Sequence, residues 1–480
     1  MHFSILFILA CAAEQEAAPK TLPCSLTEQT EISFAPTTML CVQVDMEQED
    51  FTALGAQYRF GDEPKDQFSG VLGHIASSCN RPFPDPFDYF PADIQVEGLQ
   101  AIDIGVRKKG FIGSLLEGSA ERPSLKVKAD KFIANQTIGE IANITLNNNL
   151  SDATRMRTCL TYSIFADAGY PAPRCNLANV MVNGQSLGAY THVEPIKNDF
   201  LLRVFGNDSG SLYEATIADF TTDHFAKGLG RWEVKTDATD RSTDLLLAIA
   251  HALQQDNETL EDALSQVMDV DLLLQFWALE TLTGHWDGFT AGTNNTYIYF
   301  DPENAGRGVL IPWGPDDALR DNDEDSAEED EPSFVSSELT RRISRHPALQ
   351  QRYLATLEQL LTEVWNEDAL LTRIDNFSTQ VATAETTFEE HQDAVDELSS
   401  WIMGQREAIE EYIAQGGDLG NKAPLSCGED MSDFSELGDL VSLYSHSCAS
   451  SPSGGFHWFT LALLLLMRRR LSPRQFAKPH

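Results

Sequence analysis

The stretch of sequence that decides the fold runs from residue 284 to residue 317 and reads GHWDGFTAGTNNTYIYFDPENAGRGVLIPWGPDD. Its polar and hydrophobic runs predict a helix end, a polar loop, a strand, a turn, a second strand and a final polar loop. Asp287, Asn294 and Asn295 fall in the first loop, and Asp316 follows the hydrophobic hairpin. Phosphoryl transfer needs such a set, because a base orients the acceptor hydroxyl while an amide and a carboxylate hold Mg²⁺ on the phosphates. A His-x-Asp sequence on its own is more typical of ordinary turns and helix caps.

Helices are expected on both sides of this stretch. Asp244, and then Asp269 or Asp271, are helix-capping residues that precede apolar residues at helical spacing. The helix that leads into residue 284 is too apolar to lie on the surface, so we expect it to be buried against the site. The expected helices span residues 245–253, 256–268, 272–282, 336–365 and 378–413.

The first half of the chain has the pattern of a β-rich fold. Residues 39–45 and 102–106 alternate between apolar and polar side chains, and the proline-rich segment 81–87 interrupts any helix. A helix is expected from about residue 152 to Ala168, and a hairpin around Asn183-Gly184. The fold class is therefore α+β, with a β-rich lobe, a helical lobe and a cleft between them.

Composition excludes several classes of protein. The 480 residues include 34 basic and 73 acidic side chains, and 34 − 73 gives a net charge of −39. Such a charge argues against nucleic acid or an anionic membrane face as the main partner. With 42% hydrophobic residues the chain can bury a large core, which excludes whole-chain disorder. We expect one domain over residues 38–415, with the β-rich lobe over 38–200 and the mostly helical lobe over 201–415.

Both ends of the chain indicate export from the cytoplasm. Residues 1–20 contain a short apolar run typical of a secretory signal, and the sequence before Cys11 resembles a bacterial lipobox, which predicts a lipid anchor. A plain signal peptide is the alternative, because the first residues carry no Lys or Arg. After a linker over 416–453, residues 454–480 join an apolar stretch to three arginines and resemble a C-terminal sorting tail of the GlyGly or Myxo type, with a terminal buried or amphipathic helix as the alternative. We therefore expect a lipoprotein-like protein in the envelope or on the outer surface.

The cysteines fit an oxidising compartment. If Cys11 and Cys448 belong to processing signals, an even number of cysteines is left. Cys159 and Cys175 close a short loop and are the best candidates for a disulfide, although two buried thiols would also fit. The sequence contains no CxxC motif, so zinc and thioredoxin-type chemistry are not expected.

Several segments in order resemble one known family, the spore coat protein H (CotH) kinases, which are atypical protein kinases with a two-lobed fold. Residues 106–110 resemble the R-x-K-G segment of that family, residues 122–128 its K-P-S-y-K-i-k strand, and residues 152–162 its D-x-t-x-x-R-x-x-l-x-Y helix. Further matches follow at residues 166–174, 182–184, 188–190 and 193–194, so the resemblance extends over about residues 38–413.

The resemblance implies roles for individual residues. It implies Asp287 as catalytic base, Lys126 as the strand lysine on the phosphates of ATP, and Asn295 or Asn294 as support for the metal or the phosphates. Asp316 would be the carboxylate that binds Mg²⁺ or Mn²⁺. Glu194 could face the nucleotide, and its alternative is a surface carboxylate on a strand.

One departure from the family pattern concerns the metal. The commonest pattern is P-W-D-x-D, and here Gly314 stands where the first acidic residue is expected, while Asp316 keeps the second. A site with one carboxylate fewer should bind Mg²⁺ less tightly or recruit Asp317. The acidic run that follows, residues 321–331, is typical of a solvated linker, and Ca²⁺ binding is the alternative.

These observations predict an extracytoplasmic kinase that transfers the γ-phosphoryl group of ATP to a Ser or Thr hydroxyl of a secreted or envelope protein. The alternative is a surface module with weak or no activity that binds calcium, a glycan or a matrix protein.

Overall fold

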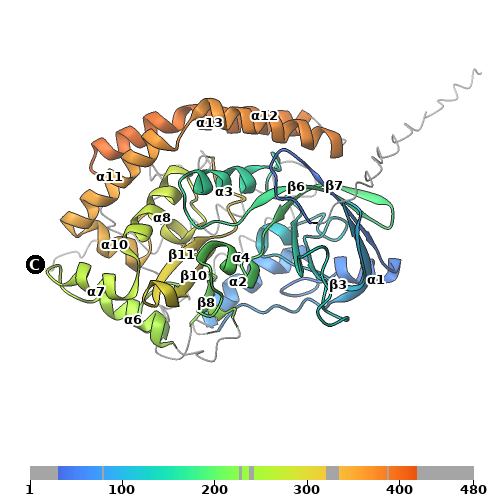
Figure 1. The fold of residues 1–480 in the computed structure, drawn as a ribbon, viewed down its shortest axis with the longest axis horizontal. Helices are drawn as coiled ribbons and strands as arrows, with labels where there is room; N and C mark the ends of the chain where they lie inside the picture. The colour runs from blue at the N-terminus through green and yellow to red at the C-terminus, as the bar shows by residue number, and fades with distance from the viewer. Residues whose placement is uncertain are drawn as a thin grey trace, which may run out of the picture.

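A computed structural model describes residues 31–77, 81–225, 230–236, 243–320, 334–385 and 389–418. Strands from the first half of the chain gather at one end of the molecule, and helices from the second half occupy the other end (Figure 1). This is the mixed α and β architecture that the sequence predicts. The expected signal, linker, sorting tail and acidic run lie outside the described residues.

The first half closes into a β-barrel, which was not predicted in this form. The strands are hydrogen-bonded in the order β1-β2-β3-β4-β5-β7-β6, and β6 returns to β1 as a parallel pair that closes the barrel. Alternate residues such as Val42, Val106 and Val127 fill the interior, so the opposite face of each strand is left for polar side chains. The strands are β1 (Leu40–Asp45), β2 (Phe90–Val96), β3 (Leu99–Lys108), β4 (Leu125–Lys128), β5 (Asn143–Asn147), β6 (Cys175–Val182) and β7 (Gln185–Val193).

The hairpin between β6 and β7 is the one that the sequence predicts. Asn183 and Gly184 both have positive φ, at 51° and 76°. Two such residues in a row are typical of a type I′ turn, whose twist matches that of the flanking strands.

The second half surrounds a buried helix, α8 (Val270–Leu282), as expected. Asp269 caps it by accepting a hydrogen bond from the backbone N–H of Leu272 at 3.2 Å. The indole of Trp277 stacks on the ring of Tyr353 with 3.6 Å between the centroids, which packs α8 against α11 (Pro347–Glu363). A sheet with strand order β11-β10-β8-β9 lies beside α8, formed by β8 (Ser211–Ala215), β9 (Trp232–Val234), β10 (Thr296–Asp301) and β11 (Arg307–Pro312).

The other helices of this half are α4 (Asn198–Phe205), α5 (Thr222–Phe225), α6 (Asp244–Leu253), α7 (Leu260–Val267), α9 (Phe289–Gly292), the 3₁₀ turn η2 (Pro302–Asn304), α10 (Glu338–Ser344), α11 (Pro347–Glu363), α12 (Glu367–Ala384) and α13 (Glu389–Ala414).

Several helix predictions were wrong in their limits. The first half contains α1 (Gln48–Gly55), α2 (Pro64–Ser77) and the 3₁₀ turn η1 (Ile112–Leu115), where only strands and turns were expected. The helix predicted over 336–365 is divided into α10 and α11, because Pro347 cannot continue the hydrogen bonding of α10 and starts a new helix instead. The helix predicted over 378–413 is likewise two helices, α12 and α13. No helix in the described part of the chain is long and apolar enough to cross a membrane.

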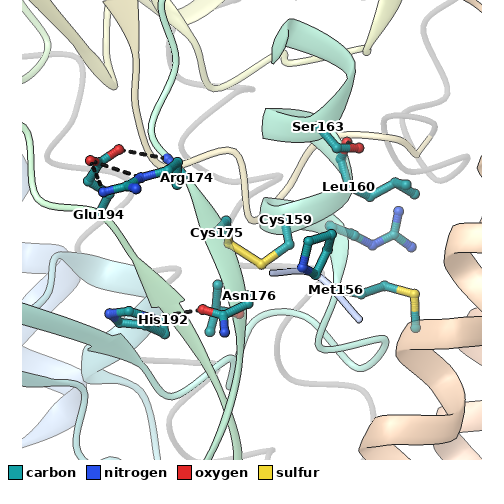
Figure 2. Close-up of a disulfide and its surroundings, with 12 residues drawn as sticks. Met156, Cys159, Leu160, Ser163, Arg174, Cys175, Asn176, His192 and Glu194 are labelled. Carbon is teal, nitrogen blue, oxygen red and sulfur yellow. Dashed lines mark hydrogen bonds and ion pairs between the residues drawn. A yellow bond between two sulfur atoms is a disulfide. The ribbon is translucent and has the colours of Figure 1, made fainter. Parts of the chain in front are cut away.

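A disulfide fixes the junction between the barrel and the helices. Cys159 on α3 (Arg157–Asp167) is bonded to Cys175 at the start of β6, with 5.0 Å between their Cα atoms (Figure 2). This confirms the predicted pairing. Cys41 is disulfide-bonded as well.

The C-terminal helices brace the same junction. Helix α12 packs against β6 and β7, and α13 runs back along it toward α11 (Figure 1). Just after α12, the carboxylate of Glu385 accepts hydrogen bonds from the backbone N–H of Ala189 on β7 and from Arg122.

Candidate active site

The loop that follows α8 brings together three residues that the sequence predicted as a set. Oδ1 of Asp287 accepts a hydrogen bond from Nδ2 of Asn294 at 3.1 Å, and Oδ2 accepts one from Nδ2 of Asn295 at 2.7 Å. The Asn295 amide also donates to the backbone carbonyl of Asp287 at 3.1 Å. Asn295 has a φ of 46°, a conformation that asparagine adopts more readily than most residues. The two amides therefore hold the Asp287 carboxylate in one orientation.

The electrostatics of Asp287 suit a general base. Burial raises the pKa of Asp287 to about 7, against the lowering effect of the Asn294 hydrogen bond. The charges of Asp316 and Asp317 raise it further. A carboxylate that titrates near neutral pH can accept a proton from a hydroxyl and release it again.

Asp316 follows the β10–β11 hairpin and lies within the electrostatic reach of Asp287. Its Oδ2 accepts a hydrogen bond from Oγ of Ser151 at 2.8 Å. Burial raises the pKa of Asp316, and the charge of Asp152 adds to the shift. Because neighbouring carboxylates repel each other in this region, a cation would be stabilised there.

The residues present fit a divalent cation only in part. Asp316 supplies a carboxylate, and Oδ1 of Asn295 accepts no hydrogen bond from any described residue, so it could also serve as a ligand. Within the described residues, no three His, Cys, Asp or Glu side chains stand close enough to form a metal site by themselves. Mg²⁺ commonly takes one or two carboxylates and completes its shell with water and substrate phosphates, so two protein ligands are sufficient for this chemistry.

Neither Gly314 nor Asp317 supplies the carboxylate that the P-W-D-x-D pattern places at position 314. Gly314 has a φ of 54°, and a Cβ atom built on it would lie 2.8 Å from Oδ1 of Asn295. Asp317 is engaged elsewhere, because its Oδ1 lies 2.7 Å from Nε of Arg320. Asp317 can therefore contribute charge to the site as it stands, but direct ligation would require it to leave this ion pair.

The outer face of the barrel presents Lys126 in a group of cations. Lys126 on β4 is directly opposite Arg107 on β3, so both side chains lie on the same face of the sheet. Burial lowers the pKa of Lys126 to about 7, and the nearby charges of Lys197 and Arg107 lower it further. Its ammonium group makes no hydrogen bond or ion pair with another residue in the described part of the chain. Carboxylates lie nearby as well, because Asp85 is ion-paired with Arg107 and the charge of Glu214 raises the pKa of Lys126. Lys126 itself is left available to a bound anion.

A second lysine on this face was missed by the sequence reasoning. Lys109 is two residues beyond Arg107, and it donates a 2.5 Å hydrogen bond to Oδ1 of Asn147. Burial lowers its pKa to about 8, and the charge of Asp316 is the strongest opposing influence. Lys109 therefore connects the cationic barrel face with the carboxylate site. The strand period of two from Arg107 to Lys109 is the signal that could have identified it.

A glycine in the 3₁₀ turn η1 was also missed. A Cβ atom on Gly113 would lie 3.5 Å from Oγ of Ser151 and 3.8 Å from Oδ2 of Asp316. The backbone of this segment thus passes beside Asp316, where a larger residue than glycine would narrow the space over the carboxylate.

Glu194 is engaged in a different network. Its carboxylate accepts hydrogen bonds from the guanidinium of Arg174 at 2.8 Å and from the backbone N–H of Arg174 at 3.0 Å (Figure 2). It also accepts one from the guanidinium of Arg203 at 2.5 Å. It is buried and makes no hydrogen bond to Asp287, Asn295 or Asp316. Glu194 therefore holds Arg174 and Arg203 in place near the Cys159–Cys175 disulfide. A contact between Glu194 and a nucleotide stays a prediction.

Much of the described chain is similar to known proteins. A family model described as CotH kinase protein matches residues 107–417, which include Lys109, Lys126, Asp287, Asn295 and Asp316. The chain belongs to the CotH kinase family. This CotH family member is 25% identical over 225 residues to invasin CotH2 of Rhizopus delemar, and 24% identical over 200 residues to the inner spore coat protein H of Bacillus subtilis. These matches cover 44% and 38% of the chain, and 37% and 52% of the two relatives.

Proposed function

We propose that this CotH family member is an atypical protein kinase that transfers the γ-phosphoryl group of ATP to a Ser or Thr hydroxyl. The observation that carries the proposal is the Asp287 carboxylate, which Asn294 and Asn295 orient and whose pKa burial raises to about 7. The charges of Asp316 and Asp317 act on Asp287, and Lys109 at the end of β3 acts in turn on Asp316. The two-lobed kinase-like arrangement, with the barrel as one lobe, is part of the proposal.

Each residue has a task in the proposed reaction. Asp287 accepts the proton of the acceptor hydroxyl while the hydroxyl oxygen forms a bond to the γ-phosphorus. The bond between that phosphorus and the β–γ bridging oxygen breaks, and ADP leaves. Lys126 and Lys109 hold phosphate oxygens. Asp316 and Oδ1 of Asn295 would hold Mg²⁺ or Mn²⁺, which neutralises the charge of the phosphates when it is bound.

The site of action that we propose is outside the cytoplasm. The Cys159–Cys175 disulfide supports an oxidising compartment. The two relatives are named as an invasin and a spore coat protein, which fits a surface or envelope location. The acceptor would then be a secreted or envelope protein, and the lipid anchor at Cys11 or the C-terminal tail would hold the kinase at a membrane.

The proposal is tested with the full chain, labelled ATP and Mg²⁺ or Mn²⁺. The parent should label itself or an added protein, and Asp287→Ala and Asp316→Ala should abolish labelling without a large change in melting temperature. Both groups act on the transition state or the phosphates, so their loss lowers rate more than stability. Labelling of both variants at the parental rate would contradict the assignment.

Gly314 supports a second candidate, a surface module of low activity that binds calcium, a glycan or a matrix protein. With one carboxylate fewer, the site has less charge to hold a catalytic metal. Replacing the carboxylates of residues 321–331 by amides distinguishes the kinase from the binding module. A kinase should need more metal for the same maximal rate, whereas a calcium-binding module should lose calcium binding in calorimetry.

A further inference from the structure

We propose that Glu280 is a positioning residue that holds the Asp287 loop in its reactive geometry. The proposal rests on the proposed kinase function, because it takes Asp287 as the base. Glu280 lies on the last turns of α8, seven residues before Asp287, and its side chain is fully buried. It would act on the reaction only through the loop.

The Glu280 carboxylate is hydrogen-bonded to the segment that follows Asp287. Oε1 accepts from the backbone N–H of Phe289 at 3.0 Å, and Oε2 accepts from the backbone N–H of Thr290 at 2.7 Å and from its Oγ1 at 2.6 Å. Three donors on two successive residues fix both oxygens of the carboxylate. These are the first residues of α9, whose N–H groups have no partner within the helix.

Backbone hydrogen bonds carry this restraint on to the asparagines. The N–H of Thr293 donates to the carbonyl of Phe289 at 3.0 Å, and the N–H of Asn294 donates to the carbonyl of Gly288 at 3.3 Å. Asn294 and Asn295 then donate to the carboxylate of Asp287. Glu280 therefore fixes the short turn from which both amides that orient the base extend.

Gly288 shows how closely the loop is pressed onto Glu280. A Cβ atom on Gly288 would lie 2.4 Å from Oε1 of Glu280 and 2.7 Å from Nδ1 of His285. Its φ of −80° is one that alanine adopts without strain. A methyl group at this position would thus press on the carboxylate of Glu280 and on the imidazole of His285, which lie 3.5 Å apart, and the backbone conformation itself would not resist it.

A need for stability does not by itself explain a carboxylate here. Helix α8 is buried among apolar side chains, and a fully buried carboxylate is costly unless every acceptor is satisfied. Apolar replacements of buried charged groups are frequently as stable as the original. Glu280 instead supplies two directed acceptors to one loop, as a group that sets the position of that loop would.

The test compares Glu280→Ala, Glu280→Gln and Gly288→Ala with Asp269→Ala. Asp269 caps the opposite end of the same helix and is remote from the loop, so its loss should weaken α8 without moving Asp287. Initial rates of phosphoryl transfer are measured well below every melting temperature, together with the KM for ATP.

Since a displacement of about 1 Å in a reacting group costs about 100-fold in rate, we expect kcat to fall by about that factor in Glu280→Ala with KM nearly unchanged. Glu280→Gln keeps one carbonyl acceptor and should recover part of the loss, Gly288→Ala should resemble Glu280→Ala, and Asp269→Ala should keep the parental kcat.

Equal kcat values for Glu280→Ala and Asp269→Ala, or an effect on KM alone, would overturn the proposal. Hydrogen exchange supplies a readout that does not depend on activity. The amides of Phe289 and Thr290 should exchange faster in Glu280→Ala while those in the first turns of α8 stay protected, and unchanged protection at both amides would overturn the proposal as well. A parent that transfers no phosphate would refute the proposed function, whereas the exchange experiment would still decide whether Glu280 holds the loop.

Discussion

Gly314 and Asn295 pack so closely that a Cβ atom on Gly314 would lie 2.8 Å from Oδ1 of Asn295. A side chain at this position, where the P-W-D-x-D pattern places an acidic residue, therefore fits only if the amide of Asn295 moves. We predict that Gly314→Asp lowers labelling rather than improving it, because the new side chain displaces the amide that orients Asp287. The positive φ of 54° adds a conformational cost, so the free energy of unfolding should fall by about 1–3 kcal/mol.

Gly306 provides the matched control for this substitution. It also has a positive φ, at 71°, but a Cβ atom there meets nothing within 4 Å. Gly306→Asp should thus show the conformational cost without the loss of labelling. Tighter Mg²⁺ binding and faster labelling in Gly314→Asp, at no greater loss of stability than in Gly306→Asp, would refute the prediction.

The raised pKa of Asp287 predicts how stability depends on pH. The unfolded chain binds fewer protons than the folded protein between pH values of about 4 and 7, because the folded pKa is about 7 and the unfolded pKa is about 3.9. The free energy of unfolding contributed by this group therefore falls as pH rises through that window. Asp287→Asn removes the effect, so in metal-free buffer its stability relative to the parent should increase from pH 4 to pH 7 by about 3 kcal/mol. Denaturant titrations across this range check the sign, and a constant difference would show that Asp287 does not titrate there.

Lys126 predicts that ATP binding is linked to proton uptake. Burial lowers its pKa to about 7, so at pH 8 most molecules carry the neutral amine. A phosphate placed beside it raises this pKa and draws a proton from the buffer. Calorimetry in buffers of different ionisation enthalpy should show uptake of up to about one proton at pH 8, and Lys126→Met should reduce it. Proton release, or equal uptake by parent and variant, would place the phosphates elsewhere.

The disulfide between Cys159 and Cys175 should stabilise the fold around the site. It closes a loop of 16 residues, for which the loss of chain entropy predicts about 3 kcal/mol. We expect the Cys159→Ala, Cys175→Ala double variant to lose about this amount in denaturant titration. Adding reductant should bring the parent down to the level of the variant, and a double variant as stable as the oxidised parent would contradict the account.

The sequence predicts the mixed α and β architecture and one hydrogen-bonded group of the candidate site. Asp287, Asn294 and Asn295 are close in the chain, so their spacing alone already places them together. The charge interaction of Lys109 with Asp316 joins residues that are remote in the sequence. It depends on how the end of β3 and the loop after β11 come together in space. Pattern analysis alone does not determine such pairings.

Barrel closure was missed for the same reason. It requires the parallel pairing of β1 with β6, which has no local signature in the sequence. The division of the helix predicted over 336–365 has a local cause. Pro347 is present in the sequence, and because proline cannot continue the hydrogen bonding of a preceding helix, it predicts a break at that position.

The most direct test of the kinase assignment compares ATP labelled at the γ-phosphate with ATP labelled at the α-phosphate. The full chain is incubated with each nucleotide and Mg²⁺, and covalent label is measured on the protein and on Asp287→Ala. Phosphoryl transfer with Asp287 as base predicts label from the γ-position only, and none on Asp287→Ala. Label from the α-position, equal labelling of Asp287→Ala, or no label from either nucleotide would contradict the assignment.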